Sequence, residues 1–354
     1  MTVTRFTWVL TSVITASCAS VMAQQSLFVS SGDTDSVLFY NATTGAFHNQ
    51  FASGGGLDEP EGIAFGPDGN FYVASRTNEI LRFNGTTGAF IDVFASGNGM
   101  TDPAGIAFGG PDNDLYISSG IPDEGPGGNQ VLRFDGTTGA FKAVLDLNND
   151  GDLDDPEGLA FGPDGLLYVN SAENGEVKRY DPATNGFVDT FVEAANSGGL
   201  LDPTGIVFGP DGDLFVSSPE TSEVKRYDGT TGAFEGNFIA AGSGGLEEPE
   251  GMVFGLNGNL LVVAEATNAV LEFDGTTGAF IGEFVTPGSG NLSEPTFAIL
   301  GPTPDIAVIP LPPAVWSGLL MIGGLAVVRT LRGRFLACST RGRDARARSR
   351  EFRV

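Results

Sequence analysis

One phrase recurs along the chain, and its spacing constrains the fold more than any other feature. It reads DEPEGIAFGPDGNFYVAS at 58–75, and close copies begin at residues 154, 201 and 247. The acid-Pro pair at its start occurs six times, with proline at 60, 103, 156, 203, 249 and 295, at spacings of 43 to 53 residues. A repeat of this length indicates an array of identical supersecondary units.

Each repeat reads as four short strands joined by turns. In the second copy, alternating apolar residues at 63–65, a Pro-Asp-Gly turn at 67–69 and an aromatic run at 71–73 predict the first two strands. Residues 80–83 and 89–94, on either side of a turn that starts at Asn84-Gly85, predict the third and fourth strands. Four antiparallel strands in about 45 residues are typical of a propeller blade.

The two ends of the array predict how the ring closes. The first copy lacks an opening strand and supplies only three strands, near 26–29, 37–40 and 46–47. The last copy supplies only an opening strand, at 294–300. Three N-terminal strands and one C-terminal strand complete a sixth blade, which removes exposed sheet edges. We therefore predict an all-β, six-bladed β-propeller over residues 24–301.

The repeated phrase, followed by ILRF at 80–83, resembles NHL repeats over roughly 26–301, and more loosely the gluconolactonase and senescence-marker propellers. NHL repeats usually place an aspartate after the second strand. Here the equivalents are Ser75, Ser119, Ser171, Ser218 and Glu265. The looser resemblance implies one divalent metal in the channel, held by a glutamate of the entry position together with Asn and Asp from other blades. Asn170 is the amide that could join Glu61 or Glu157.

The segments outside the repeats read as export and sorting signals. Residues 1–23 have the charge, apolar stretch and small residues of a signal peptide. A Pro-rich linker at 302–313 precedes an apolar segment at 314–328, which predicts a transmembrane helix, and a basic tail at 329–354, which is expected in the cytoplasm.

The motif Ile309-Pro310-Leu311-Pro312, followed by an apolar span and a basic cluster, resembles the VPLPA variant of PEP-CTERM sorting signals. That resemblance implies export, anchoring and processing by an exosortase-type membrane peptidase. The chain then continues for about twenty residues beyond the cluster, which such signals normally do not. The alternative is an ordinary C-terminal membrane anchor.

The region between the two signals is strongly acidic. Residues 24–328 contain 8 Lys and Arg against 42 Asp and Glu, a balance of −34. Such a field repels nucleic acid and attracts cations. Both cysteines, Cys18 and Cys338, fall in the terminal segments, so the repeat region has no thiol site.

The residue after the repeated proline is the best clue to function. In a propeller the first strand of each blade lines the central channel, so this entry residue faces the axis or the funnel at the channel mouth. In blade order the six are Glu61, Ala104, Glu157, Thr204, Glu250 and Thr296. Three carboxylates converging on one axis would raise each other's pKa or bind a hard cation such as Ca²⁺. The alternative is that the glutamates point into water.

A second candidate metal site lies just before Glu157. The stretch DLNNDGDLDDPE matches the calcium-loop template, with oxygen ligands at alternate positions: Asp146, Asn148, Asp150, Asp152 and Asp154. Glu157 holds the twelfth position, but the repeat already accounts for it. The alternative is an acidic linker between two blades.

These patterns favour a binding or scaffold protein of the cell surface or extracellular matrix, possible partners being polysaccharide or surface proteins. The opposing hypothesis is a metal-dependent lactonase or related hydrolase with its site in the channel. The hydrolase requires Glu61, Glu157 or Asn170 to converge within coordination distance. The binding hypothesis predicts that they are dispersed and that recognition resides in the variable loops, of which the longest insertion is 120–130.

Overall fold

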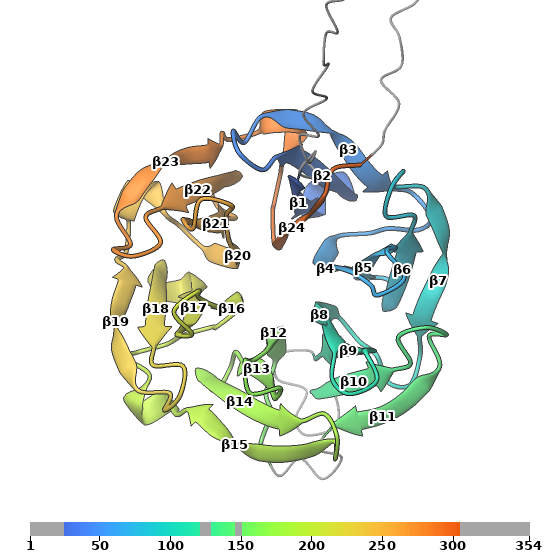
Figure 1. The fold of residues 1–354 in the computed structure, drawn as a ribbon, viewed down its shortest axis with the longest axis horizontal. Coiled ribbons are helices and arrows are strands. Elements are labelled where there is room, and N and C mark those ends of the chain that lie inside the picture. Colours follow the sequence, from blue (N-terminus) through green and yellow to red (C-terminus); the bar gives the residue numbers. More distant parts are fainter. Residues whose placement is uncertain (1–24, 121–128, 146–150, 305–354) are drawn as a thin grey trace, which may run out of the picture. The chain divides into compact units, whose positions relative to one another are not determined.

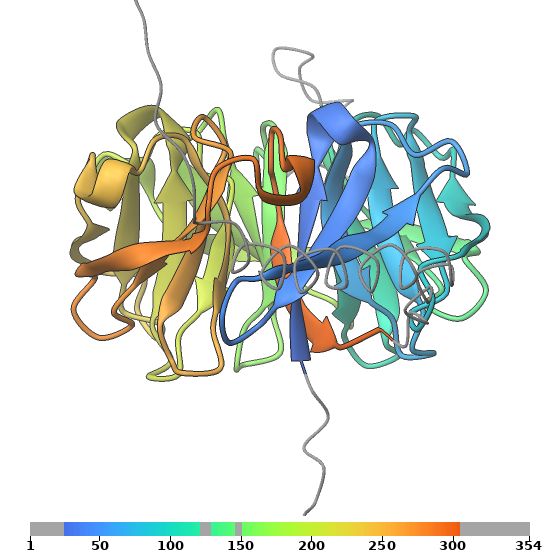
Figure 2. The same cartoon turned by 90° about the horizontal axis from the view of Figure 1, so that it is seen from above.

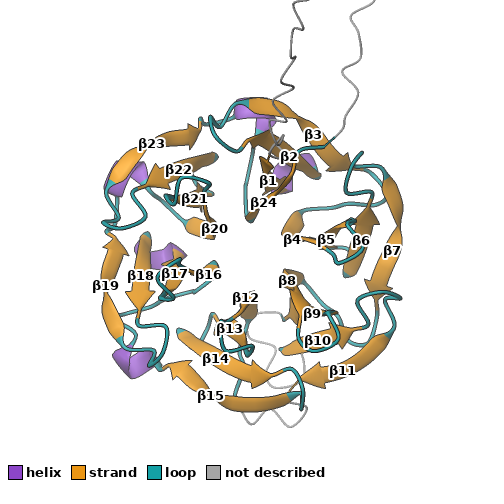
Figure 3. Ribbon diagram, in the orientation of Figure 1, coloured by secondary structure: helices purple, strands orange, loops and turns teal. Residues whose placement is uncertain are grey.

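The computed structural model describes residues 25–120, 129–145 and 151–304, and these form a six-bladed β-propeller (Figure 1). Every blade is a four-stranded antiparallel sheet, with its strands in order from the channel to the rim. Figure 2 shows the ring from the side, and Figure 3 shows that strands dominate it. The predicted signal peptide, linker, transmembrane segment and basic tail lie outside the described residues, apart from the first linker residues, 302–304.

The blades are numbered along the chain, and the strand bounds are as follows. Blade 1 consists of β24 (Ala298–Pro302), β1 (Gln25–Ser31), β2 (Ser36–Asn41) and β3 (Phe47–Ser53). Blade 2 consists of β4 (Pro60–Phe65), β5 (Phe71–Ser75), β6 (Glu79–Phe83) and β7 (Phe90–Ser96). Blade 3 consists of β8 (Pro103–Gly109), β9 (Asp114–Ser119), β10 (Gln130–Phe134) and β11 (Phe141–Leu145).

The second half of the ring continues the pattern. Blade 4 consists of β12 (Pro156–Phe161), β13 (Leu167–Ser171), β14 (Glu176–Asp181) and β15 (Gly186–Val192). Blade 5 consists of β16 (Ile206–Phe208), β17 (Leu214–Ser218), β18 (Glu223–Tyr227) and β19 (Phe234–Ile239). Blade 6 consists of β20 (Pro249–Phe254), β21 (Leu260–Ala264), β22 (Ala269–Phe273) and β23 (Phe280–Val285).

The remaining regular elements are short 3₁₀ turns, named η1 to η5. Their bounds are Gly32–Thr34, Ala194–Asn196, Pro219–Thr221, Ser243–Gly245 and Ser289–Asn291. Within the described residues, no helix is long and apolar enough to cross a membrane.

The predicted closure of the ring is confirmed. Strand β24 pairs antiparallel with β1 over five residue pairs, from Gln25 opposite Pro302 to Val29 opposite Ala298. Side chains reinforce the junction, since the hydroxyls of Ser30 and Thr296 lie 2.9 Å apart. The last strand therefore completes the blade that the first three strands begin.

Aromatic rings on the second strands hold neighbouring blades together. Each packs near the phenylalanine that ends the next blade's first strand, usually edge to face. The ring centroids lie 5.2 Å apart for Phe28–Phe65, 4.7 Å for Tyr72–Phe108, 5.4 Å for Tyr116–Phe161, 4.9 Å for Tyr168–Phe208 and 5.4 Å for Phe215–Phe254. Five of the six junctions between neighbouring blades thus contain the same aromatic contact.

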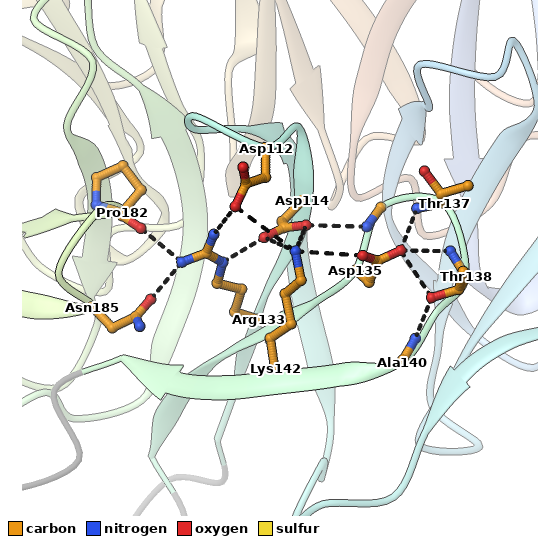
Figure 4. Close-up of polar contacts among 11 residues, drawn as sticks. Asp112, Asp114, Arg133, Asp135, Thr137, Thr138, Ala140, Lys142, Pro182 and Asn185 are labelled. Atoms are coloured by element: carbon orange, nitrogen blue, oxygen red, sulfur yellow. Dashed lines mark hydrogen bonds and ion pairs between the residues drawn. The ribbon is translucent and has the colours of Figure 1, made fainter.

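A buried ion-pair network joins blades 3 and 4 (Figure 4). The Arg133 guanidinium donates to Asp114, at 2.6 Å, and to the Pro182 carbonyl of the next blade, at 2.8 Å. It also donates to the Asn185 side chain, while Lys142 binds Asp114 from the other side. Because the charges are paired and hydrogen-bonded, their burial is tolerated.

Two details of the predicted repeat alignment are wrong. The repeat spacing aligns Gly186 of blade 4 with the outer-turn glycines Gly45, Gly88, Gly139, Gly232 and Gly278. In the structure Asn185 takes the left-handed position of that turn instead, with φ of 58°, because an asparagine side chain tolerates this conformation. In blade 6, Pro249 pairs with Ala264, so Ala264 is the counterpart of the serines and Glu265 lies one residue further on.

The outer-turn glycines can be tested by substitution. Gly88 has φ of 69°, and an added Cβ would lie 1.7 Å from the Phe51 carbonyl oxygen of the preceding blade. Gly69 has φ of 78° with nothing within 4 Å. We expect Gly69→Ala to destabilise by about 1–2 kcal/mol through backbone strain alone. Gly88→Ala should cost at least twice as much, measured as the fall in Tm by calorimetry. Equal losses for the two variants would contradict this packing.

Candidate functional site

The six entry residues all line one cavity at the mouth of the channel, as their place in the repeat predicts. Its volume is about 540 Å³. Within the described residues its lining includes nine carboxylates and one cation, Arg76. The carboxylates belong to Glu61, Asp102, Asp155, Glu157, Glu173, Asp202, Glu220, Glu250 and Glu265. The mouth therefore concentrates the acidic charge that the sequence shows only as a total.

The acid that precedes each repeated proline adopts an unusual backbone conformation. All six have positive φ, between 38° and 52°: Glu59, Asp102, Asp155, Asp202, Glu248 and Glu294. Non-glycine residues rarely take this conformation, and a following proline restricts them further. In several blades the preceding blade's turn holds the strained residue, since Asp102 N donates to Asn78 Oδ1 at 2.8 Å and Glu294 N to Asn268 Oδ1 at 2.7 Å.

Arg76 neutralises one part of the mouth. It directly follows β5, and its guanidinium lies between carboxylates of blades 2 and 3. Its nitrogens lie 2.7 Å from Glu59, 3.4 Å from Glu61 and 3.5 Å from Asp102. Three acids thus share one cation.

Glu61 is enclosed by other charged groups. Burial raises its pKa to about 7, and Asp102 and Glu265 act in the same direction. Arg76 and a hydrogen bond with Thr296 oppose this rise. Near neutral pH this carboxyl can therefore exchange a proton.

Glu250 and Glu265 form a second group, on blade 6. Their carboxyls are hydrogen-bonded, and only 9% of Glu250 is exposed. Burial raises the pKa of both groups, and for Glu250 the neighbouring Glu265 adds to the rise. Two carboxylates this close share a proton more readily than both ionise.

In the described part of the cavity lining, the acids of blade 4 have no cation comparable to Arg76. Burial raises the pKa of Asp155 to about 6, with Asp202 as the largest charge contribution. Burial also raises the pKa of Glu157 well above its usual value, and Glu61 is the largest contributor among its neighbours. This side of the mouth therefore holds uncompensated carboxylates.

The structure distributes the predicted metal ligands over different places. Glu61, Glu157 and Glu250 line the cavity. However, within the described residues no three acidic, histidine or cysteine side chains lie close enough together to hold a metal ion. The entry glutamates are thus arranged around the mouth rather than converging on one point.

The predicted calcium loop is described only in part. Asp146, Asn148 and Asp150 lie outside the described residues. Asp152 is exposed, and Asp154 accepts a hydrogen bond from Asn129 at 2.6 Å. The calcium loop stays a prediction.

Asn170 serves a contact between blades. It is fully buried, and its amide nitrogen donates to the carbonyl oxygens of Thr204, at 2.9 Å, and Gly205, at 3.4 Å. Its Oδ1 is buried and has no hydrogen-bond partner among the residues that the structure describes. The side chain is not part of the cavity lining.

Sequence analysis missed several residues of the mouth. Arg76, Ala172 and Glu265 all directly follow a second strand, and Glu173 lies one residue further on. The strand register was the signal that could have found them. The position directly after the second strand holds a basic residue in blade 2, a small one in blade 4 and an acidic one in blade 6.

The raised pKa values predict how stability depends on pH. An unperturbed glutamate ionises near 4.5, so between pH 4.5 and about 7 the folded chain binds more protons than the unfolded chain. This contribution to stability is complete below pH 4.5 and is lost as pH rises through about 7. Glu250→Gln keeps a neutral side chain next to Glu265. We expect it to raise Tm at pH 7.5 by roughly 3 °C, as a gain of ~1 kcal/mol gives in a domain of this size.

The measurement is Tm by calorimetry between pH 5 and 7.5. Glu247→Gln, a change at an exposed glutamate, is the matched control for lost surface charge. The parent should lose stability as pH rises, and the loss should be smaller only in the Glu250 variant. Equal slopes in both variants would contradict the role of the buried pair.

Comparisons with known proteins support the fold and leave the activity open. The N-terminal model of the strictosidine synthase-like family matches residues 50–83. No curated protein matches the sequence. The fold is similar to a chain in the crystal structure of a nidogen/laminin complex, with TM-score 0.62 and 14% identity over 78% of this chain and 98% of that one.

Two further solved structures have the same fold. A Bacteroides caccae protein of unknown function gives TM-score 0.59 and 14% identity, over 78% of this chain and 98% of its own. Virginiamycin B lyase from Staphylococcus aureus, in a catalytically inactive form with quinupristin, gives TM-score 0.53 and 16% identity, over 75% of this chain and 86% of the lyase chain. At these identities the likeness is one of fold alone.

Proposed function

We propose that this chain is a non-enzymatic binding or scaffold protein and that its ligand site is the acidic channel mouth. The observation that carries the proposal is the single cavity of about 540 Å³ with nine carboxylates and one arginine in its described lining. A concave site lined by one sign of charge focuses the field and raises the local concentration of oppositely charged ligands. The mouth therefore selects cations.

Calcium is the inorganic cation that we propose for this site. Carboxylate oxygens suit it, and it accepts water as part of its shell. Since no three acidic side chains converge in the described residues, a bound ion would contact one or two of Glu61, Glu157 and Glu250 and complete its shell with water. Such binding would relieve the repulsion among the glutamates and stabilise the ring.

The setting that we propose is the cell surface or extracellular matrix. The signal-peptide pattern at 1–23 supports export, and the VPLPA-like motif with its apolar and basic segments supports anchoring and processing by an exosortase-type peptidase. An extracellular polysaccharide or a surface protein would be the partner. The net negative field argues against nucleic acid.

The alternative function is a metal-dependent lactonase-like hydrolase in the channel. The propeller fold is compatible with both classes, since the similar structures include a lyase and a component of a nidogen/laminin complex. The hydrolase requires Asn170 to converge with Glu61 or Glu157. Asn170 instead lies buried in the contact with Thr204 and Gly205. The geometry therefore favours binding.

Calcium titration of the purified full chain by calorimetry tests the proposal. We expect binding by the parent and a loss of at least tenfold in affinity in a Glu61/Glu157/Glu250→Gln variant. An Asp146/Asp150→Asn variant, which alters the predicted calcium loop, is the matched control and should retain binding at the mouth. Loss of calcium binding only in the Asp146/Asp150→Asn variant would show that the ion binds at the predicted calcium loop and not at the mouth. No binding by the parent would contradict the calcium proposal.

A further inference from the structure

The repeat places two equivalent groups of carboxylates around the mouth, two blades apart. The blade-2 wedge consists of Glu59, Glu61 and Asp102, and the blade-4 wedge consists of Asp155, Glu157 and Asp202. In both, one acid precedes the repeated proline, one follows it, and the third precedes the proline of the next blade.

The residue that distinguishes the two wedges follows the second strand. Pro60 pairs with Ser75 and Pro156 with Ser171, so Arg76 and Ala172 occupy the same place in the repeat. The hydrogen bonds agree, because Ser75 binds the backbone of Asp58 as Ser171 binds that of Asp154. Blade 4 therefore repeats the three acids of blade 2 but has a methyl group in place of the guanidinium.

The blade-2 wedge shows what such a site accommodates. The Arg76 guanidinium lies within 3.5 Å of carboxylates from all three acids. A guanidinium suits this arrangement since its planar group carries five donors that can face several carboxylates at once. The chain thus contains an internal example of the occupied state.

The blade-4 wedge has the acids of that state without a cation. Asp155 lines the cavity and is only 8% exposed. Within the described residues, its side chain makes no hydrogen bond or ion pair, and neither does that of Glu157. A buried carboxylate without a partner is costly. The raised pKa of Asp155 has the same cause, namely burial among Asp202, Glu173 and Asp102.

The two described cations of blade 4, both on β14, are already paired with other acids. Lys178 of blade 4 binds Glu176 at 2.6 Å, and Arg179 binds Asp189. Arg76 is held by the blade-2 wedge. Apart from protonation of the acids themselves, a cation from a ligand is thus the remaining way to compensate the ionised wedge.

We propose that the blade-4 wedge binds a guanidinium group supplied by a ligand, above Ala172 and between Asp155, Glu157 and Asp202. The inference rests on the proposed binding function of the mouth and names one chemical class for it. The group can belong to a free guanidino compound or to an arginine side chain of a protein partner, since the wedge recognises the same planar cation in both.

Calorimetric titration of the full chain with agmatine, at pH 7.5 and low salt, tests the inference. We expect one site in the parent. Ala172→Arg supplies the missing guanidinium internally, so it should abolish agmatine binding and raise Tm. Arg76→Ala empties the blade-2 wedge, so it should raise the stoichiometry from one site to two. Undiminished agmatine binding in the Ala172→Arg chain would overturn the inference.

Two further variants separate charge from steric blocking. Asp202→Asn removes one exposed carboxylate of the wedge and should weaken agmatine binding at least tenfold, whereas Glu247→Gln, outside the wedge, should leave it unchanged. Equal affinities in these two variants would overturn the inference.

The choice of probe tests the chemical class and its source. Putrescine, which lacks the guanidinium, should bind at least tenfold more weakly than agmatine, and equal binding would overturn the assignment to guanidinium. A short arginine peptide that binds more tightly than agmatine would identify a protein partner as the source, and the reverse order a free guanidino compound. Calcium binding without agmatine binding overturns this inference alone, and binding of neither overturns the proposed function as well.

Discussion

The pairing of β24 with β1 is the interaction on which the rest of the structure depends. It joins residues more than 260 positions apart in the chain and leaves each blade with two neighbours. Without it, the ring would open within blade 1, and β24 and β1 would be left with unpaired edges. Closure also fixes the six entry residues around one axis. The acidic mouth is therefore a consequence of the ring rather than of any single blade.

That geometry has an electrostatic cost. A closed ring brings together carboxylates that are far apart in the sequence, and burial prevents water from screening them. The chain relieves the repulsion differently in three places. Blade 2 supplies Arg76, blade 6 places the carboxyl of Glu265 beside that of Glu250 so that the pKa of both is raised, and blade 4 has only Ala172. The chain thus relieves the repulsion from within at blades 2 and 6 but not at the blade-4 wedge, which is why we locate binding there.

The sequence was sufficient for the architecture because the fold repeats. The six acid-Pro pairs, the turns and the divided sixth blade each follow from local patterns. They agree with the structure except at the outer turn of blade 4, where Asn185 takes the left-handed position. Of the site, only the residues that belong to the repeated phrase could be predicted. Glu61, Glu157 and Glu250 could be placed at the axis, but Arg76 and Glu265 could not, because they do not belong to the repeated phrase and only the strand register aligns them. The dispersal of the glutamates depends on the ring's radius, which no local pattern contains.

The central claim is that ring closure gathers partly desolvated carboxyls at one mouth. Its most direct test is a pH titration of the full chain followed by NMR of ¹³C-labelled glutamate carboxyls. Our account predicts that Glu61 titrates near pH 7 and that Glu157 and Glu250 stay protonated well above 4.5, the ordinary glutamate value. If all glutamate carboxyls titrated together near 4.5, the mouth would be open to water, and the claim would be contradicted.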